Sequence, residues 1–122
     1  MTARFAQWTL DVHDVERMLA FWSAALGYEI DGDHLRPPAD AEPGAPTVWM
    51  QRTAASKSGK LRGHIDLYVA GDGTVAKEVT RLIALGARRV DVGQTGDEGF
   101  DVLADPEGNE FCVLRRRRRA DV

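Results

Sequence analysis

Hydrophobic and polar positions alternate along two stretches of the chain, and a helical pattern follows each stretch. In residues 5–12 and again in residues 62–69 every second side chain is apolar, which predicts a strand with one apolar face. Each strand leads into a segment whose apolar residues recur at helical spacing, and these segments end at Gly27 and Gly86. The order of strand, helix and glycine therefore occurs twice, so we interpret the chain as two copies of one module.

Each predicted helix has a residue suited to begin it and a single apolar stripe. Asp14 is the expected N-cap of the first helix, and the second is expected to begin at about Thr74. The two stripes consist of Val15, Met18, Leu19, Trp22, Ala25 and Leu26, and of Val75, Val79, Leu82 and Ile83. A helical stripe has to bury against the apolar face of a sheet, so each helix should cover the strand before it.

The rest of each module is predicted to form short strands. Further strands are expected at residues 28–30, 34–36, 47–52, 87–92, 100–104 and 110–114. The Asp31-Gly32 pair indicates a hairpin turn, and the prolines of residues 37–46 indicate a loop. The predicted class is α+β: two tandem βαβββ modules, about 4–53 and 61–115, forming a cupped mixed sheet with the helices on its outer face.

The other face of the two repeated strands is polar. It carries the side chains of Gln7, Thr9, Asp11, His64, Asp66 and Tyr68. Paired modules place equivalent residues opposite each other, so Gln7 and His64 are candidates for one shared site. A concave surface with convergent polar groups is the default position for a ligand pocket.

Composition narrows the class of protein. The 122 residues are 43% hydrophobic and 29% charged, as in an ordinary globular domain, and no apolar run is long enough to span a membrane. The single cysteine, Cys112, excludes an intrachain disulfide, so we expect a cytoplasmic protein. We expect a small-molecule ligand, with neither a nucleic acid nor a membrane as partner.

Charge is distributed unevenly. The 19 acidic residues outnumber the 16 basic ones, and five of the basic residues are the consecutive arginines Arg115 to Arg119. The acidic body disfavours nucleic-acid binding. The basic tail, residues 115–122, is interpreted as a solvated segment; a clamp on an acidic partner subunit and an electrostatic contact with nucleic acid are the alternatives.

Four motifs carry a resemblance to a known family. They are Trp8-Thr9-Leu10-Asp11-Val12, residues 21–28 with their Leu26-Gly27 end, His64-Ile65-Asp66-Leu67, and residues 103–114 with the turn Asp105-Pro106-Glu107-Gly108-Asn109. With these motifs the chain resembles, over about residues 5–115, the vicinal oxygen chelate superfamily of glyoxalase I, bleomycin-resistance proteins and extradiol dioxygenases. The amino-acid sequence of the last motif is most similar to that of a glyoxalase-like domain subgroup, most of whose members have no assigned substrate.

The resemblance implies a metal site built from the first and last strands of each module. Carried over by position, the ligands are Gln7, His64 and Cys112, with Cys112 standing where the family usually has Glu, and Gln51 is the remaining counterpart. The ion would be nickel, zinc, manganese or iron, or no metal binds. A thiolate suits zinc better than a hard cation, and a thiol can also be simply a small buried apolar group.

His64 is the first candidate for catalysis, because imidazole can act as a general base near neutral pH. Asp66 lies two residues along on the same face, so it could hold His64 as a base or act itself. For both residues the structural alternative is a hydrogen-bonded or salt-bridged strand residue. The candidates for substrate binding are Gln7, Trp49, Gln51, Tyr68 and Cys112.

The basic residues Lys57, Lys60 and Arg62 precede His64 and could attract an anionic ligand, although a solvated loop explains them equally well. The first functional hypothesis is a lyase or isomerase acting next to a carbonyl in a polar cup. The alternative is a protein that sequesters an antibiotic or metabolite, as bleomycin-resistance proteins do. A regulatory module with a vestigial pocket is a third hypothesis, and the resemblance also implies a homodimer.

Overall fold

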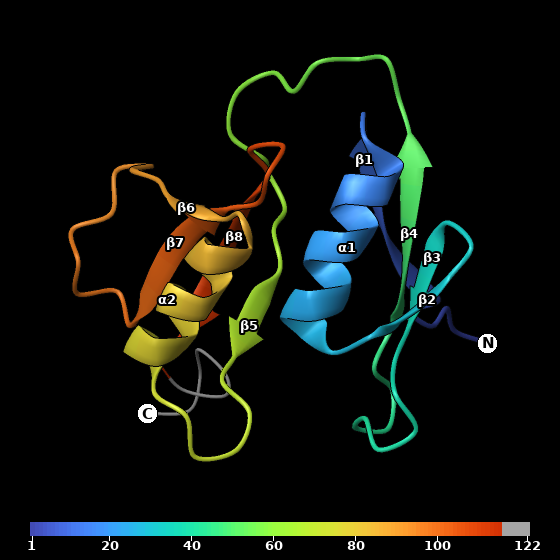
Figure 1. Cartoon of the computed structure of the whole chain (residues 1–122), viewed down its shortest axis with the longest axis horizontal. Helices are drawn as coiled ribbons and strands as arrows, with labels where there is room; N and C mark the ends of the chain where they lie inside the picture. Colours follow the sequence, from blue (N-terminus) through green and yellow to red (C-terminus); the bar gives the residue numbers. More distant parts are fainter. Residues whose placement is uncertain (116–122) are drawn as a thin grey trace. The chain divides into compact units, whose positions relative to one another are not determined.

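The computed structural model describes residues 1–115, which form two compact units, residues 1–56 and the part that begins at Lys57 (Figure 1). Apart from Arg115, the predicted basic tail lies outside the described residues. In residues 1–115 no helix is long and apolar enough to cross a membrane.

The first unit contains one helix and a four-stranded sheet. Its elements are β1 (Gln7–Val12), α1 (Val15–Leu26), β2 (Glu29–Asp31), β3 (His34–Arg36) and β4 (Thr47–Arg52). The strands lie in the order β1-β4-β3-β2, with β1 parallel to β4 and the other pairs antiparallel. The helix α1 packs on β2, β3 and β4.

The second unit repeats this plan. Its elements are β5 (Asp66–Tyr68), α2 (Val75–Leu85), β6 (Arg88–Arg89), β7 (Phe100–Ala104) and β8 (Glu110–Leu114). The strand order is β5-β8-β7-β6, and again the first strand runs parallel to the last. The predicted α+β class with tandem βαβββ modules is confirmed, and the mixed sheet takes the form of two four-stranded sheets, one in each unit.

Local side-chain chemistry sets the ends of both helices. The carboxylate of Asp14 accepts a hydrogen bond from the backbone N–H of Arg17 at 3.1 Å, and the hydroxyl of Thr74 accepts one from Lys77 N–H at 3.2 Å. Gly27 ends α1 with a φ of 70°, a left-handed conformation that favours glycine. These three expectations from the sequence are confirmed.

The middle of each apolar stripe is buried, and Val15, Ala25, Leu26 and Val75 toward the helix ends are half-buried. Met18, Leu19 and Trp22 of α1 are each at most 6% exposed, and so are Val79 and Leu82 of α2. In contrast, Ile83 was expected on the second stripe but is 40% exposed. It lies at the margin of the buried face of α2, which contacts β6 and β8.

The structure corrects the hairpin turn of the first unit. Asp31 pairs with His34, so the turn residues are Gly32 and Asp33 rather than Asp31 and Gly32. Gly32 takes a φ of 63°, which a side chain at this position would oppose.

Two strands of the second unit are shorter than predicted. β5 covers Asp66–Tyr68 instead of residues 62–69, and in the segment before it the N–H of Leu61 binds the side chain of Glu110. β6 covers two residues instead of residues 87–92, because the backbone beyond it makes local bonds to side chains. Val92 N–H donates to the Gln94 amide oxygen at 2.8 Å, and such bonds compete with a sheet ladder.

Candidate functional site

Three of the predicted site residues meet on the sheet of the second unit. Asp66 on β5 and Cys112 on β8 are partners in the parallel register, so their side chains share one face. His64 precedes β5 and places its Nδ1 3.2 Å from Asp66 Oδ1. One potential ligand atom from each of the three residues lies within 4.8 Å of the other two.

The His64–Asp66 pair is accessible. The two side chains are 34% and 42% exposed, so the pair adds little to stability as an ion pair. Its chemical effect is orientation. The carboxylate of Asp66 faces Nδ1, and an imidazole that carries its proton on Nδ1 leaves Nε2 as the acceptor and therefore as the base.

Cys112 occupies a different environment from its two neighbours. It is 4% exposed and packs in an apolar cluster with Val102, Leu114, Val90 and Phe100. Burial, followed by the negative charge of Asp66, raises the pKa of the thiol to about 11. The thiol is therefore protonated at neutral pH and is not an activated nucleophile.

Because of this cluster, the sheet face that carries Asp66 is not polar throughout. This face is polar along β5, the edge strand, but apolar at Cys112 and Leu114 of β8 and at Val102 and Phe100 of β7. β8 lies between β5 and β7, and all five of its residues are buried. A central strand with both faces covered holds apolar side chains on both of them.

The three donor atoms fit a borderline metal cation. Imidazole nitrogen, carboxylate oxygen and thiolate sulfur are the ligands that zinc takes in proteins, whereas hard cations prefer oxygen alone. The cost of ionising the buried Cys112 thiol would have to be offset by the charge of the cation. Within the second unit, Asp66 supplies the third ligand atom beside His64 and Cys112.

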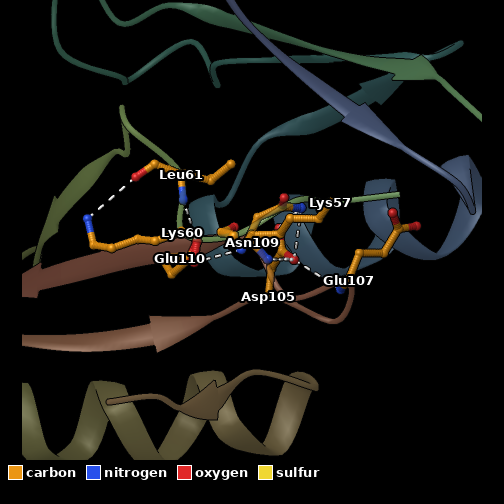
Figure 2. A network of polar contacts seen from close by, with 8 residues as sticks. Lys57, Lys60, Leu61, Asp105, Glu107, Asn109 and Glu110 are labelled. Carbon is orange, nitrogen blue, oxygen red and sulfur yellow. Dashed lines mark hydrogen bonds and ion pairs between the residues drawn. The ribbon is translucent and has the colours of Figure 1, made fainter. Parts of the chain in front are cut away.

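Glu110 anchors the loop that leads to His64 (Figure 2). Its side chain is 8% exposed and accepts a hydrogen bond from Leu61 N–H at 3.0 Å, and Lys57 Nζ lies 2.9 Å from its other oxygen. Burial by itself raises the carboxyl pKa, but the bonds from Leu61 and Lys57 outweigh it, so the pKa lies below its usual value. Sequence reasoning did not assign Glu110 a role, although its position two residues before Cys112 places it on the same face of β8.

The turn before β8 is built by a buried carboxylate. Asp105, which is 1% exposed, accepts hydrogen bonds from the N–H groups of Glu107 and Asn109, both at 3.0 Å, and from the Asn109 amide (Figure 2). This is the turn chemistry expected from the motif. It fixes where β8 begins and thereby the register of Cys112.

The remaining predicted residues belong to other parts of the chain. Gln7, Trp49 and Gln51 belong to the first unit, and Gln7 donates to the Thr9 hydroxyl at 3.3 Å. Tyr68 is 39% exposed on β5, opposite Leu114. That Gln7 faces His64 across a shared site stays a prediction.

A group in the first unit was missed by sequence reasoning, which gave His34 no role. The ring of His34 stacks on Trp49 with centroids 5.8 Å apart and planes 6° from parallel. Asp33 holds both rings, since its oxygens lie 2.7 Å from His34 Nδ1 and 3.1 Å from Trp49 Nε1. The signal that could have revealed this group is the cross-strand pairing of His34 with Trp49 in an antiparallel hairpin.

Comparison with known families decides the identity of the fold. A family model described as a glyoxalase-like domain matches residues 7–114. The chain belongs to this glyoxalase-like domain family. The resemblance to the vicinal oxygen chelate superfamily is thereby confirmed. No curated protein sequence matches the chain.

Solved structures of similar fold support the assignment of this glyoxalase-like domain. A hypothetical protein from S. aureus is 19% identical with a TM-score of 0.69, covering 95% of this chain and 96% of its own. A glyoxalase/bleomycin resistance protein/dioxygenase family enzyme from Burkholderia phytofirmans is 19% identical with a TM-score of 0.65, covering 88% and 94%. The fosfomycin resistance protein FosX from Listeria monocytogenes is 17% identical with a TM-score of 0.69, covering 94% and 92%. At these identities the likeness establishes the fold.

Proposed function

We propose that this glyoxalase-like domain is a lyase or isomerase that moves a proton next to a carbonyl group of a small molecule. The observation that carries the proposal is the 3.2 Å approach of His64 Nδ1 to Asp66 Oδ1 on an accessible part of the sheet. A carboxylate that orients an imidazole in this way is the usual arrangement for a general base.

The roles of the two residues follow from their geometry. His64 Nε2 takes the proton from the carbon next to the carbonyl, and the imidazolium that forms returns it to a neighbouring atom of the substrate. Asp66 keeps Nδ1 protonated and stabilises the imidazolium by its charge. Together they supply general acid–base catalysis, which is typically worth about 10²–10⁴-fold in rate.

A divalent cation fits the proposal as a cofactor. His64, Asp66 and Cys112 would hold it, and zinc matches this donor set best. When bound, such a cation acts as a Lewis acid that polarises a carbonyl oxygen. His64 and Asp66 cannot be metal ligands and the catalytic base pair at the same time, so their substitutions have to be compared with and without added metal.

The second candidate function is sequestration of an antibiotic or metabolite without chemical change. The observation that favours it is the neutral, buried thiol of Cys112 beside Val102 and Leu114, at the position where the family usually has a Glu ligand. A binding protein needs an apolar wall of this kind, and it needs neither a base nor a metal.

The decisive experiment measures solvent-deuterium incorporation into a panel of small carbonyl compounds by NMR. We expect incorporation or a new product with the wild-type protein, and loss of at least about 100-fold in rate in His64→Gln. His13→Gln, which changes a histidine of the first unit, is the matched control and should keep the activity. A compound that is bound and recovered unchanged, with no deuterium, would support sequestration instead.

The homodimer implied by the family resemblance and the cytoplasmic setting inferred from the lone cysteine are further parts of this proposal. Sedimentation of the purified protein at micromolar concentration tests the first, since a monomer there contradicts it.

A further inference from the structure

The loop before His64 contains two lysines, Lys57 and Lys60, whose ammonium groups have different neighbours. Lys57 is paired: its Nζ lies 2.9 Å from Glu110 Oε2, and it also donates to the carbonyl of Gly59. Its side chain is 27% exposed and that of Glu110 only 8%, so this ion pair is partly removed from water. The carboxylate of Glu110 therefore compensates the charge of Lys57, and this ion pair holds the loop on β8.

Lys60 belongs to the same loop but has different neighbours. Its Nζ lies 3.4 Å from the carbonyl of Leu61, whose N–H is bound by Glu110 (Figure 2). Within residues 1–115, Lys60 makes no ion pair with a carboxylate. The buried anchor thus holds the backbone beside an exposed ammonium group that has no acidic partner there.

This ammonium lies within electrostatic reach of the His64 cluster. The Leu61 backbone that Lys60 contacts is bonded to Glu110, and Glu110 lies two residues before Cys112 on the same face of β8. Two carboxylates of this part of the sheet are engaged, Glu110 with Lys57 and Asp66 with His64. A cation in this position, with its acidic neighbours already paired, is suited to an anionic ligand.

We propose that Lys60 binds an anionic oxygen group of the ligand, a carboxylate, phosphate or phosphonate, beside the His64–Asp66 pair. The inference rests on the proposed function in one respect: an anion held by Lys60 would position the carbon that His64 deprotonates. Lys60 is then the residue that selects charged substrates over neutral ones of the same shape. Arg62, exposed and two residues closer to His64, adds to the positive potential of the same rim.

The test compares two probes of one skeleton, lactate and its neutral amide lactamide, by NMR titration of the backbone amides. We expect lactate to shift the amides of residues 60–66 and Cys112 in a saturable manner, and to bind at least about tenfold more tightly than lactamide. In Lys60→Gln this preference should disappear, and in Lys60→Arg it should persist. Lys77→Gln, which removes a lysine from α2, is the matched control and should behave as wild type.

Inorganic phosphate serves as a third probe and separates the two kinds of anion. Competition of phosphate with lactate in the wild type, lost in Lys60→Gln, assigns phosphate or phosphonate chemistry to the site; saturation by lactate alone assigns a carboxylate. Equal binding of lactate and lactamide, an unchanged preference in Lys60→Gln, or no saturable binding of either anion would overturn the proposal. A thermal unfolding curve for each variant verifies that it is folded.

Failure of this inference can be told apart from failure of the proposed function. Binding of lactate does not require proton transfer, so His64→Gln should keep the preference for lactate even if no deuterium exchange is ever detected. Conversely, deuterium exchange that is equally fast for neutral and anionic carbonyl compounds would leave His64 as the base and remove Lys60 from the site.

Discussion

Asp66 and Cys112 lie opposite each other in the parallel pair of β5 and β8, and this relationship sets the chemistry of both side chains. The carboxylate raises the pKa of the thiol by its charge and by a hydrogen bond, in addition to the larger effect of burial. The same carboxylate approaches His64 Nδ1 at 3.2 Å. Asp66 therefore connects an accessible imidazole to a buried thiol.

The Cys112 thiol should make stability depend on pH in the alkaline range. Its folded pKa of about 11 exceeds the ordinary value of 9.0, so the folded state retains a proton that the unfolded chain releases. The contribution is fully present below pH 9.0 and is lost as the pH rises toward about 11. Urea unfolding across this window should show a falling free energy of unfolding in the wild type and a smaller slope in Cys112→Ala.

Removing the charge of Asp66 should make the same thiol more acidic. In Asp66→Asn the Coulombic and hydrogen-bond effects that raise the thiol pKa are lost, while burial remains. We expect the thiolate absorbance to appear at lower pH than in the wild type. An unchanged or higher titration midpoint would contradict the contact between these two side chains.

Loss of the Glu110 carboxylate should destabilise the second unit. Glu110→Gln breaks a buried pair with Lys57 and weakens the acceptor for Leu61 N–H, at a cost of about 1–3 kcal/mol. Because the pKa of this carboxyl is lowered, its contribution is present above the ordinary value of 4.5 and is lost as the pH falls through the folded value. Chemical denaturation measures the effect, and Glu29→Gln, at an exposed strand position, should change stability by less than about 0.5 kcal/mol.

A glycine at the end of α1 provides a test of backbone conformation. Gly27 has a φ of 70°, and a methyl group added to it would meet open space, so Gly27→Ala should destabilise by about 1 kcal/mol through backbone strain alone. Gly63→Ala is the matched control, because Gly63 also has open space but no positive φ. Equal thermal shifts for the two variants would argue against the left-handed cap.

Zinc titration distinguishes the two candidate donor sets. If His64, Asp66 and Cys112 hold the cation, zinc affinity should fall at least about tenfold in Asp66→Asn and in Cys112→Ser, while Gln7→Ala should bind as wild type. A loss in Gln7→Ala with none in Asp66→Asn would favour the set implied by the family resemblance. Isothermal calorimetry in two buffers also reports the proton released when the thiol ionises.

Elements whose signals are local could be predicted from the amino-acid sequence. The strands at residues 47–52, 100–104 and 110–114 and the caps at Asp14, Thr74 and Gly27 are where the pattern predicted them, because alternation, capping oxygens and glycine act within a few residues. The repeat of the module was also readable, since it is a comparison of the chain with itself.

Which side chains meet could be learned only from the folded chain. The register that sets Asp66 beside Cys112, the apolar cluster around that thiol and the stacking of His34 on Trp49 all arise between segments distant in sequence. Glu110 shows the same limit, because its buried carboxylate on β8 binds the N–H of Leu61, 49 positions earlier in the chain. A periodic pattern reports which face of an element is apolar, but pairing between elements determines each side chain's neighbours, and the neighbours set its pKa and its chemistry.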